Sequence, residues 1–176
     1  MKAIILAAGE GKRLRPLTDN IPKAMVKLFN MSLLERQIEI FQKCGINDIV
    51  VVGGYKNEKI DIKNIKQYRN ENYDSTNMIE TLFCADDELF GSTIISYGDI
   101  IFERSVLQSL INSNEDFSVI VDKNWEKFWN IRFPNPLEDA ESLKLDDNDN
   151  ILELGQNVKN INEIQGQYIG LMKFQN

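Results

Sequence analysis

The chain has 176 residues, and its 43% hydrophobic and 27% charged content is that of a folded globular protein. The net charge of −7 argues against a general affinity for nucleic acid or for an anionic membrane surface, so any phosphate chemistry needs a local cluster of cations. The chain has no histidine, the commonest general base and zinc ligand. No run of about 20 apolar residues suggests a membrane helix, and we expect a cytoplasmic protein.

The first 54 residues predict a strand–loop–helix–strand unit. Residues 2–7 form a continuous apolar run, typical of a strand buried on both faces of a parallel sheet. After a glycine-bearing loop, residues 32–35 form a capping box that begins an amphipathic helix, which we expect to end near Gly45. Residues 48–52 form a second buried strand, and the whole predicts a right-handed βαβ unit.

The remaining elements are predicted less sharply. Residues 60–65 fit either a short helix or a strand, and Thr76 is expected to cap a helix that continues to residue 85. Further patterns predict strands at residues 92–97, 117–121 and 168–174, a helix at 105–111 and a hairpin at 142–154. We therefore expect one α/β domain over residues 1–176: a Rossmann-like, mostly parallel mixed sheet flanked by helices, with a small β-hairpin extension.

The loop after the first strand is the first candidate site. Backbone N–H groups of a glycine-containing turn converge on phosphate oxygens, and Arg13 adds a planar fork while Lys12 adds a point charge. The alternative is a plain strand-to-helix turn. A dinucleotide site would need a third glycine where Leu14 stands and an acidic residue where Gly53 stands. A Walker-type loop fails as well, because no Gly-Lys-Ser/Thr follows. By itself the loop indicates only phosphate binding, and together with Lys23 it becomes a candidate triphosphate cradle.

Two further residues complete this candidate site. Lys23, fixed beside Pro22, would reach the triphosphate or an acceptor phosphate; alone it would be taken for a solvated lysine. Asp99 follows a strand and Gly98, which predicts a carboxylate at the carboxyl edge of the sheet, where open α/β sheets bind ligands. A carboxylate there suits Mg²⁺ held jointly by protein and phosphates, while the alternative is an aspartate in an ordinary turn.

A pair of tryptophans is the last candidate feature. Trp125 and Trp129 stand four residues apart and would share one helical face. Tryptophan faces attract cations, so an acceptor that carries an amine would suit them, with Asp122, Asp139 or Glu141 as a nearby counter-charge. An interpretation as core or lid residues is equally consistent with the pattern.

The run LAAGEGKRLRPLTDNIPKAMV at residues 6–26 and the run LLERQIEIFQKCGINDIVVVGGY at 33–55 resemble the sugar-phosphate nucleotidyltransferase superfamily. The pattern there is approximately L-A-A-G-x-G-[ST]-R-L-x-P-L-T-x-x-x-P-K, and Lys12 departs from it by adding a cation. Residues 72–78, 97–99, 122–132, 139–141 and 167–174 are similar to the small cytidylyltransferase branch. Members usually bring a second acidic metal ligand from beyond the last predicted strand, a segment that we expect to be absent here.

The resemblance implies that CTP and a small phosphorylated or phosphonate acceptor are the substrates and that Mg²⁺ is the cofactor, bound by Asp99. The acceptor would belong to the phosphoglutamine, phosphocholine or aminoethylphosphonate class, for surface polysaccharide or capsule modification. The implied catalytic residues are Arg13, Lys23 and Asp99. The implied nucleotide-binding residues are Leu6, Ala7, Ala8, Gly9, Glu10, Gly11, Lys12, Arg13, Gly53, Tyr97 and Gly98. The implied acceptor-binding residues are Asn77, Asp122, Trp125, Trp129 and Arg132.

The expected reaction is attack by an acceptor oxygen on the α-phosphorus of CTP, with pyrophosphate leaving. The second pKa of a phosphate monoester is about 6, so the nucleophile is already ionised at neutral pH and no histidine is needed. Two alternatives stay open at this point: a hexose-1-phosphate nucleotidyltransferase that makes dTDP-, UDP- or GDP-sugars, and a non-catalytic nucleotide-binding regulator. The sequence leaves the oligomeric state open.

Overall fold

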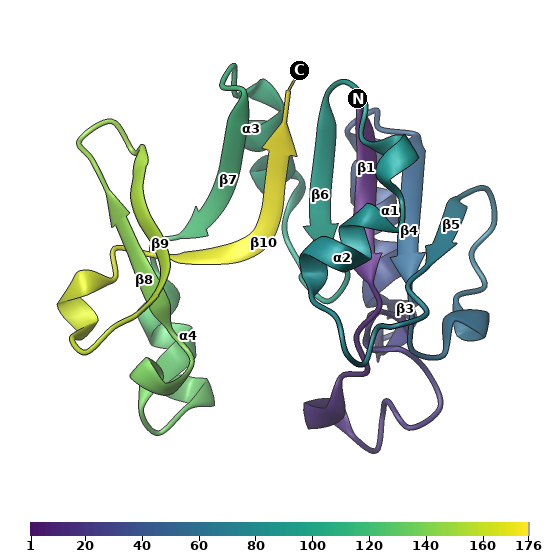
Figure 1. Ribbon diagram of the computed structural model, residues 1–176, viewed down its shortest axis with the longest axis horizontal. Helices are drawn as coiled ribbons and strands as arrows, with labels where there is room; N and C mark the ends of the chain where they lie inside the picture. Colours follow the sequence, from purple (N-terminus) through teal and green to yellow (C-terminus); the bar gives the residue numbers. More distant parts are fainter. Residues whose placement is uncertain (176) are drawn as a thin grey trace. The chain divides into compact units, whose positions relative to one another are not determined.

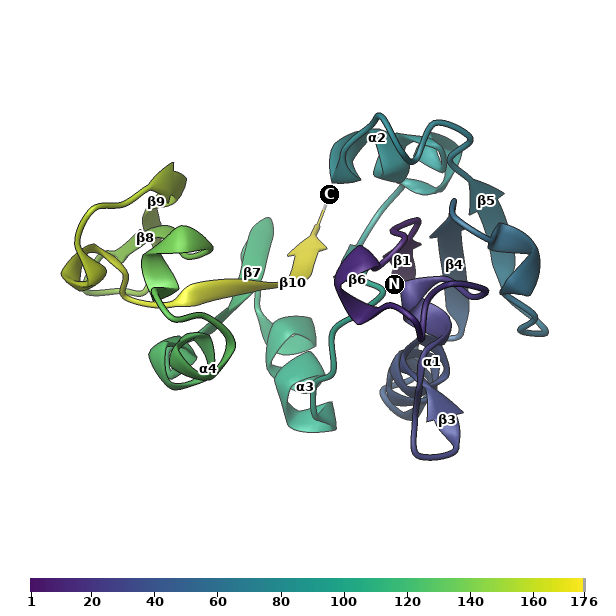
Figure 2. The ribbon, with the colours of Figure 1, turned by 90° about the horizontal axis from the view of Figure 1, so that it is seen from below.

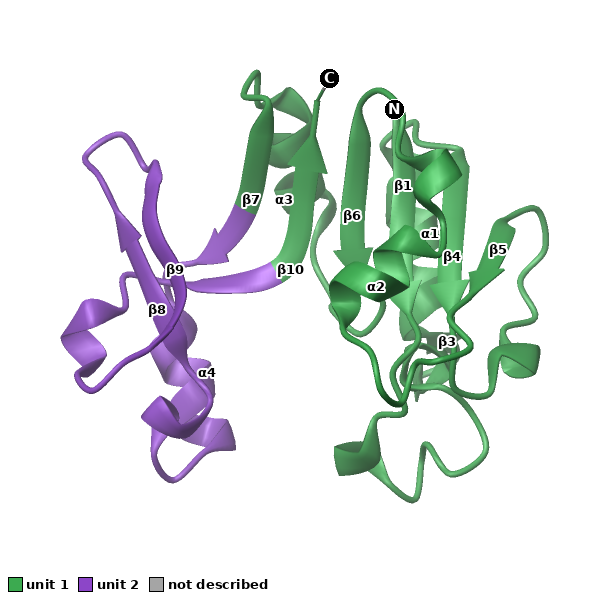
Figure 3. Ribbon diagram, in the orientation of Figure 1, with its two compact units in different colours: residues 1–119, 170–176 green, residues 120–169 purple. Residues whose placement is uncertain are grey.

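The computed structural model describes residues 1–175 and divides into two compact units (Figure 3). Unit 1 comprises residues 1–119 together with the chain from residue 170 onwards, and unit 2 comprises residues 120–169. In the described chain, every helix is too short or too polar to span a bilayer.

A six-stranded sheet forms the frame of unit 1 (Figure 1). Its order is β5-β4-β1-β6-β10-β7, and β5, β4, β1 and β6 run parallel while β10 is antiparallel to β6. The bounds are β1 (Lys2–Ala7), β4 (Asp48–Gly53), β5 (Lys66–Arg69), β6 (Thr93–Tyr97), β7 (Phe117–Asp122) and β10 (Gln167–Phe174). The end of β7 and the beginning of β10 belong to unit 2. This mostly parallel mixed sheet confirms the predicted fold class.

The central strands are buried on both faces, as their apolar runs predicted. Ala3, Ile4 and Ile5 of β1 are fully buried, and β4 and β6 flank them. In the register of the sheet, Ala7 lies opposite Gly53. Because parallel strands in register end together, the carboxyl ends of β4, β1 and β6 share one edge of the sheet, where the loops that follow them meet.

Three helices cover this sheet, with α1 (Leu33–Lys43) and α3 (Arg104–Asn112) on one face and α2 (Met78–Phe83) on the other (Figure 2). The predicted capping box of α1 is confirmed, since the Ser32 hydroxyl accepts a hydrogen bond from the Glu35 amide at 3.1 Å. The short strands β2 (Lys27–Leu28) and β3 (Met31–Ser32) form a small hairpin before α1.

Two local predictions are wrong. Asn77, not Thr76, caps α2, because the Thr76 hydroxyl already donates to the Asn72 carbonyl and accepts from Asn70. Residues 60–65 form neither helix nor strand, and the strand of this region, β5, begins at residue 66. Its sequence, Lys-Gln-Tyr-Arg, lies at an exposed edge of the sheet and therefore carries no apolar pattern.

A buried carboxylate ties the short helix at Asp86–Glu88 to the sheet. Glu88 is 4% exposed and accepts hydrogen bonds from Lys2, from Lys66 at 2.8 Å and from the Tyr68 hydroxyl at 3.0 Å. The Lys2 ammonium and then the Lys66 ammonium lower the pKa of the Glu88 carboxyl from 4.5 to about 2. The charged form of Glu88 is therefore the one that the fold stabilises.

Unit 2 contains the helix α4 (Trp125–Arg132) and the hairpin of β8 (Glu141–Leu145) and β9 (Ile151–Asn157), which confirms the predicted hairpin. Its own small core consists of Trp125, Ala140 and Ile164.

Candidate active site

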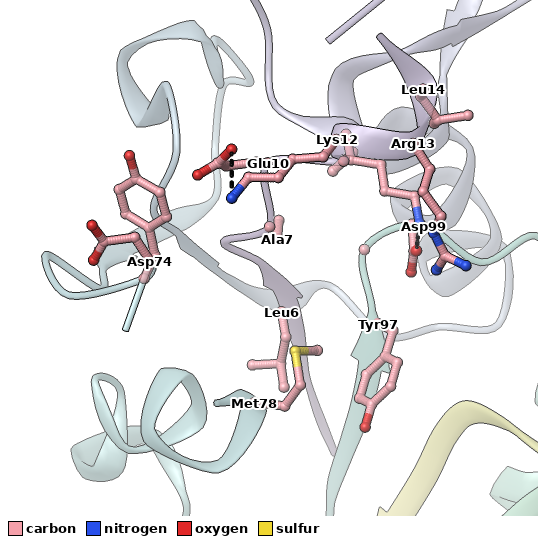
Figure 4. A pocket seen from close by; sticks show the side chains of 16 residues that line it. Leu6, Ala7, Glu10, Lys12, Arg13, Leu14, Asp74, Met78, Tyr97 and Asp99 are labelled. Carbon is pink, nitrogen blue, oxygen red and sulfur yellow. Dashed lines mark hydrogen bonds and ion pairs between the residues drawn. The ribbon is translucent and has the colours of Figure 1, made fainter. Parts of the chain in front are cut away.

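A cavity of about 470 Å³ opens in unit 1 where β1 and β6 end (Figure 4). This volume lies in the range of small-molecule sites. Most of the residues nominated from the sequence for nucleotide binding and catalysis line it. They are Leu6, Ala7, Gly9, Glu10, Gly11, Lys12, Arg13, Lys23, Tyr97, Gly98 and Asp99.

The loop after β1 folds tightly against the segment that carries Lys23. Gly11 has a φ of +67°, and a Cβ there would lie 2.8 Å from the Lys23 Cβ, so only glycine permits this approach. The Thr18 hydroxyl donates to the Gly11 carbonyl at 2.9 Å and holds the loop from its other side. The glycine therefore brings the phosphate-loop candidate and Lys23 onto one wall of the cavity.

The loop after β6 meets the end of β1 just as closely. The Gly98 amide donates to the Leu6 carbonyl at 2.8 Å, and a Cβ on Gly98 would lie 3.0 Å from the Ala7 Cβ. Asp99, the next residue, forms an ion pair with Lys23 in the cavity, and the two side chains are 32% and 30% exposed. Two charges of opposite sign are thus held at the carboxyl edge of the sheet, accessible to a ligand.

The formal charges that line the cavity balance. Lys12, Arg13 and Lys23 supply three cations, and Glu10, Asp74 and Asp99 supply three carboxylates. Glu10 lies 3.5 Å from the Lys12 ammonium, the contact dashed in Figure 4. It also accepts from the Arg15 guanidinium at 3.4 Å. A bound triphosphate would make the net charge in the cavity negative, so an additional cation would strengthen its binding.

Asp99 offers an accessible carboxylate to such a cation, and Glu10 and Asp74 line the same cavity. Residues 1–175 contain no group of three or more side chains arranged as a complete metal site. Mg²⁺ does not require one, because it keeps several waters and is bound through one or two carboxylates plus substrate phosphates. The accessible carboxylate of Asp99 at the cavity wall fits that mode.

Two residues nominated for nucleotide binding lie outside the cavity lining. Ala8 is 6% exposed, and its carbonyl accepts from the Tyr55 amide at 3.0 Å. Gly53 ends β4, and a Cβ there would lie 1.9 Å from the Asn57 Oδ1. Both residues pack the loops that support the cavity.

Five lining residues were not nominated: Leu14, Ala24, Tyr73, Asp74 and Met78. Tyr73 and Asp74 follow β5, and Tyr73 packs edge-to-face on Tyr55 with ring centroids 6.0 Å apart. The signal was available in principle, since a loop after a parallel strand reaches the same edge of the sheet. The polar sequence of β5 does not predict a strand, so the sequence alone does not place the loop after it at this edge.

The residues nominated for the acceptor fall in two places. Asn77 lies in unit 1, where its side chain accepts from the amides of Ile79 at 2.8 Å and Glu80 at 3.1 Å as the cap of α2. It does not line the cavity. The other four, Asp122, Trp125, Trp129 and Arg132, lie in unit 2.

In unit 2 the two tryptophans contact each other edge-to-face, with ring centroids 5.9 Å apart. Trp125 is 3% exposed in the unit 2 core, and the Arg132 guanidinium lies 5.1 Å from the Trp129 ring centroid. The Asp122 carboxylate accepts from the Asn124 amide at 2.8 Å, just before α4 begins. Trp125 therefore packs as core, while Arg132 presents an exposed cation held on an aromatic face.

Comparison with known proteins places the chain in a family. Residues 3–142 match the MobA-like NTP transferase domain. The chain is 46% identical over 187 aligned residues to a CTP:phosphoglutamine cytidylyltransferase of Campylobacter jejuni, with 99% of this chain and 73% of that protein covered. It is 38% identical over 117 residues to a choline-phosphate cytidylyltransferase of Streptococcus pneumoniae, with 64% and 51% covered.

Solved structures show the same fold. The structure of a CTP:phosphocholine cytidylyltransferase from Streptococcus pneumoniae superposes with a TM-score of 0.70 at 24% identity, covering 99% of this chain and 71% of that one. The inositol-1-phosphate CTP transferase of T. maritima gives a TM-score of 0.77 at 21% identity, with 99% and 70% covered. With the matched family, a relative at 46% identity and the cavity at the end of β1, the chain belongs to the MobA-like NTP transferase domain family of nucleotidyltransferases.

Proposed function

We propose that this protein transfers a cytidylyl group from CTP to a small phosphorylated or phosphonate acceptor and releases pyrophosphate. The observation that carries the proposal is the cavity in which the glycine loop, Lys23 and Asp99 meet. The choice of CTP and of an acceptor in the phosphoglutamine or phosphocholine class is supported by the names of the two relatives. We propose a cytoplasmic location and a use in surface polysaccharide or capsule modification.

The residues would act by position and charge. The backbone amides after Gly9 and the cations of Lys12 and Arg13 would hold the β- and γ-phosphates. Lys23 would contact both the α-phosphate and the acceptor oxygen, which reduces repulsion between two anions as they approach. The acceptor oxygen forms the new bond to the α-phosphorus, the bond from that phosphorus to the bridging oxygen breaks, and pyrophosphate carries the released electron pair away.

We propose Mg²⁺ as the metal, with Asp99 as its protein ligand. When bound, the ion would neutralise charge that develops on the phosphates. The chain would supply no general base, because a phosphate monoester is already largely ionised at neutral pH. The ion pair between Lys23 and Asp99 keeps both groups at the cavity wall, where this chemistry would need them.

The test is a substrate panel. The protein is incubated with Mg²⁺ and each of the four nucleoside triphosphates, paired with phosphoglutamine, phosphocholine, aminoethylphosphonate or glucose 1-phosphate, and pyrophosphate is measured. We expect release with CTP and one of the first three acceptors. Release only with glucose 1-phosphate would identify a sugar nucleotidyltransferase, and nucleotide binding without release from any pair would contradict the proposal.

A further inference from the structure

A buried glutamine lies directly behind the loop that carries Asp99. Gln37 is 1% exposed on α1, on the helix face that also buries Leu34, Ile38 and Phe41. A carboxamide in such a place is costly unless all its groups are hydrogen-bonded. The hydrogen bonds of Gln37 therefore indicate what the residue does.

All of these bonds go to β6 and the loop that follows it. The Gln37 Nε2 donates to the Tyr97 carbonyl and to the Ile100 carbonyl, both at 2.9 Å. The Ser96 hydroxyl donates to the Gln37 Oε1 at 2.8 Å. The reverse orientation of the amide would set its oxygen against two carbonyl oxygens, so this network also fixes which end of the amide points where.

The two carbonyls bracket Asp99. One belongs to the residue two positions before Asp99 and the other to the residue immediately after it, so Gln37 holds the backbone on both sides of that side chain. The Gly98 amide is bound to β1 in addition, through the Leu6 carbonyl at 2.8 Å. The short segment is thus held from two sides, while the carboxylate of Asp99 stays accessible in the cavity.

We propose that Gln37 is a positioning residue of the transfer reaction: by clamping the Tyr97 and Ile100 carbonyls, its carboxamide sets where the Asp99 carboxylate meets a metal–nucleotide complex. The inference rests on the proposed function. It gives α1 a role in the site although no residue of α1 lines the cavity. We expect Gln37 to affect the affinity of the site for the metal. Residues that hold a metal ligand in place without touching the metal commonly change metal affinity or activity by about 10- to 100-fold.

The decisive comparison is Gln37→Met against Ser96→Ala. Gln37→Met keeps the length and volume of the side chain but removes both donors to the bracket carbonyls. Ser96→Ala breaks the third bond of the same network and leaves both donors in place. Mn²⁺ affinity in the presence of CTP is measured by electron paramagnetic resonance, alongside KM for Mg²⁺, kcat and Tm.

We expect both variants to lose thermal stability, and only Gln37→Met to weaken Mn²⁺ binding and raise KM for Mg²⁺, by about 10-fold or more. Equal metal affinity in Gln37→Met and wild type, or an equal loss in Ser96→Ala, would overturn the proposal. Should Gln37→Met not fold, Gln37→Glu decides, since it is nearly isosteric and keeps the acceptor for Ser96. It should weaken metal binding in the same direction, and unchanged binding overturns the proposal.

Failure of the proposed function has a different signature. Wild-type protein that binds Mn²⁺ no more tightly with CTP than without it would refute the metal–nucleotide site itself, and the role of Gln37 with it. Wild-type protein that binds Mn²⁺ with CTP but releases no pyrophosphate would contradict the transfer reaction. In that case the metal affinities of the variants still decide the role of Gln37.

Discussion

The ammonium group of Lys23 pairs with the carboxylate of Asp99 although 76 positions separate them in the sequence. Lys23 comes from the segment after the glycine loop, and Asp99 comes from the loop after β6. The fold thus brings two charged side chains from distant parts of the sequence together at the carboxyl edge of the sheet. Each partner can be tested separately.

Replacing Lys23 by alanine should lower kcat by about 10²- to 10³-fold, because in the proposed mechanism the site loses a cation between two approaching anions. The Lys23 side chain is partly exposed and contributes little to the stability of the fold, so Tm should change little. Pyrophosphate release and circular dichroism measure the two effects. Lys27→Ala, at an exposed position nearby, is the control and should keep its activity. Near-normal turnover in Lys23→Ala would remove Lys23 from the mechanism.

Asp99→Asn should raise the Mg²⁺ concentration needed for half-maximal activity, because the amide keeps the size of the side chain but loses its charge. Asp74→Asn, at another carboxylate of the same cavity, should leave the Mg²⁺ requirement near that of wild type. A Mg²⁺ titration of pyrophosphate release makes the comparison. Identical titration curves for Asp99→Asn and wild type would exclude Asp99 as the ligand.

Gly11→Ala and Gly91→Ala form a matched pair. The two glycines have φ values of +67° and +69°, so either alanine is strained and should cost about 1–2 kcal/mol of stability. A Cβ at Gly11 meets the Lys23 Cβ at 2.8 Å, whereas a Cβ at Gly91 meets nothing within 4 Å. Only Gly11→Ala should therefore lose kcat. Denaturant unfolding and turnover separate the effects, and equal activity in both variants would show that crowding of Lys23 is unimportant.

Glu88 should make stability depend on pH in the acidic range. Its pKa in the folded protein is lowered to about 2 from 4.5, so its contribution is fully present above about pH 4.5 and is lost as the pH falls towards 2. This shift in pKa corresponds to about 3 kcal/mol of folding stability. Urea unfolding at pH 7 and pH 3 should show that the free energy of unfolding falls more in wild type than in Glu88→Gln. Parallel losses would contradict the assignment.

If Arg132 binds the acceptor as proposed, Arg132→Gln should raise KM for the acceptor and leave KM for CTP unchanged, because a guanidinium binds phosphate or carboxylate through two parallel hydrogen bonds that an amide cannot form. The exposed Lys127 of the same helix supplies the control, Lys127→Gln. Steady-state kinetics with each substrate varied in turn measures both constants. An unchanged KM for the acceptor would leave Arg132 as a packing partner of Trp129.

The buried strands and the capped helix α1 were predictable because their signals are local. Residues 2–7 are buried on both faces, and the capping box that begins at Ser32 requires only four consecutive residues. The edge strand β5 gave no such signal, since its exposed side chains are polar, and the cavity residues Tyr73 and Asp74 were missed with it. Gln37 was equally invisible, because a sequence does not show which three groups a buried amide will bind.

The position of β10 has a consequence for how the protein assembles. In the sheet, β10 lies between β6 and β7, so among the described strands β7 joins the sheet only through β10. During synthesis β7 emerges some 50 residues before β10, and its pairing in the described sheet must wait until residues 167–174 have been made. Such long-range pairing is slow to form and leaves unpaired strand edges exposed meanwhile. The strand that precedes Asp99 therefore gains its second neighbour only when synthesis has reached residue 174.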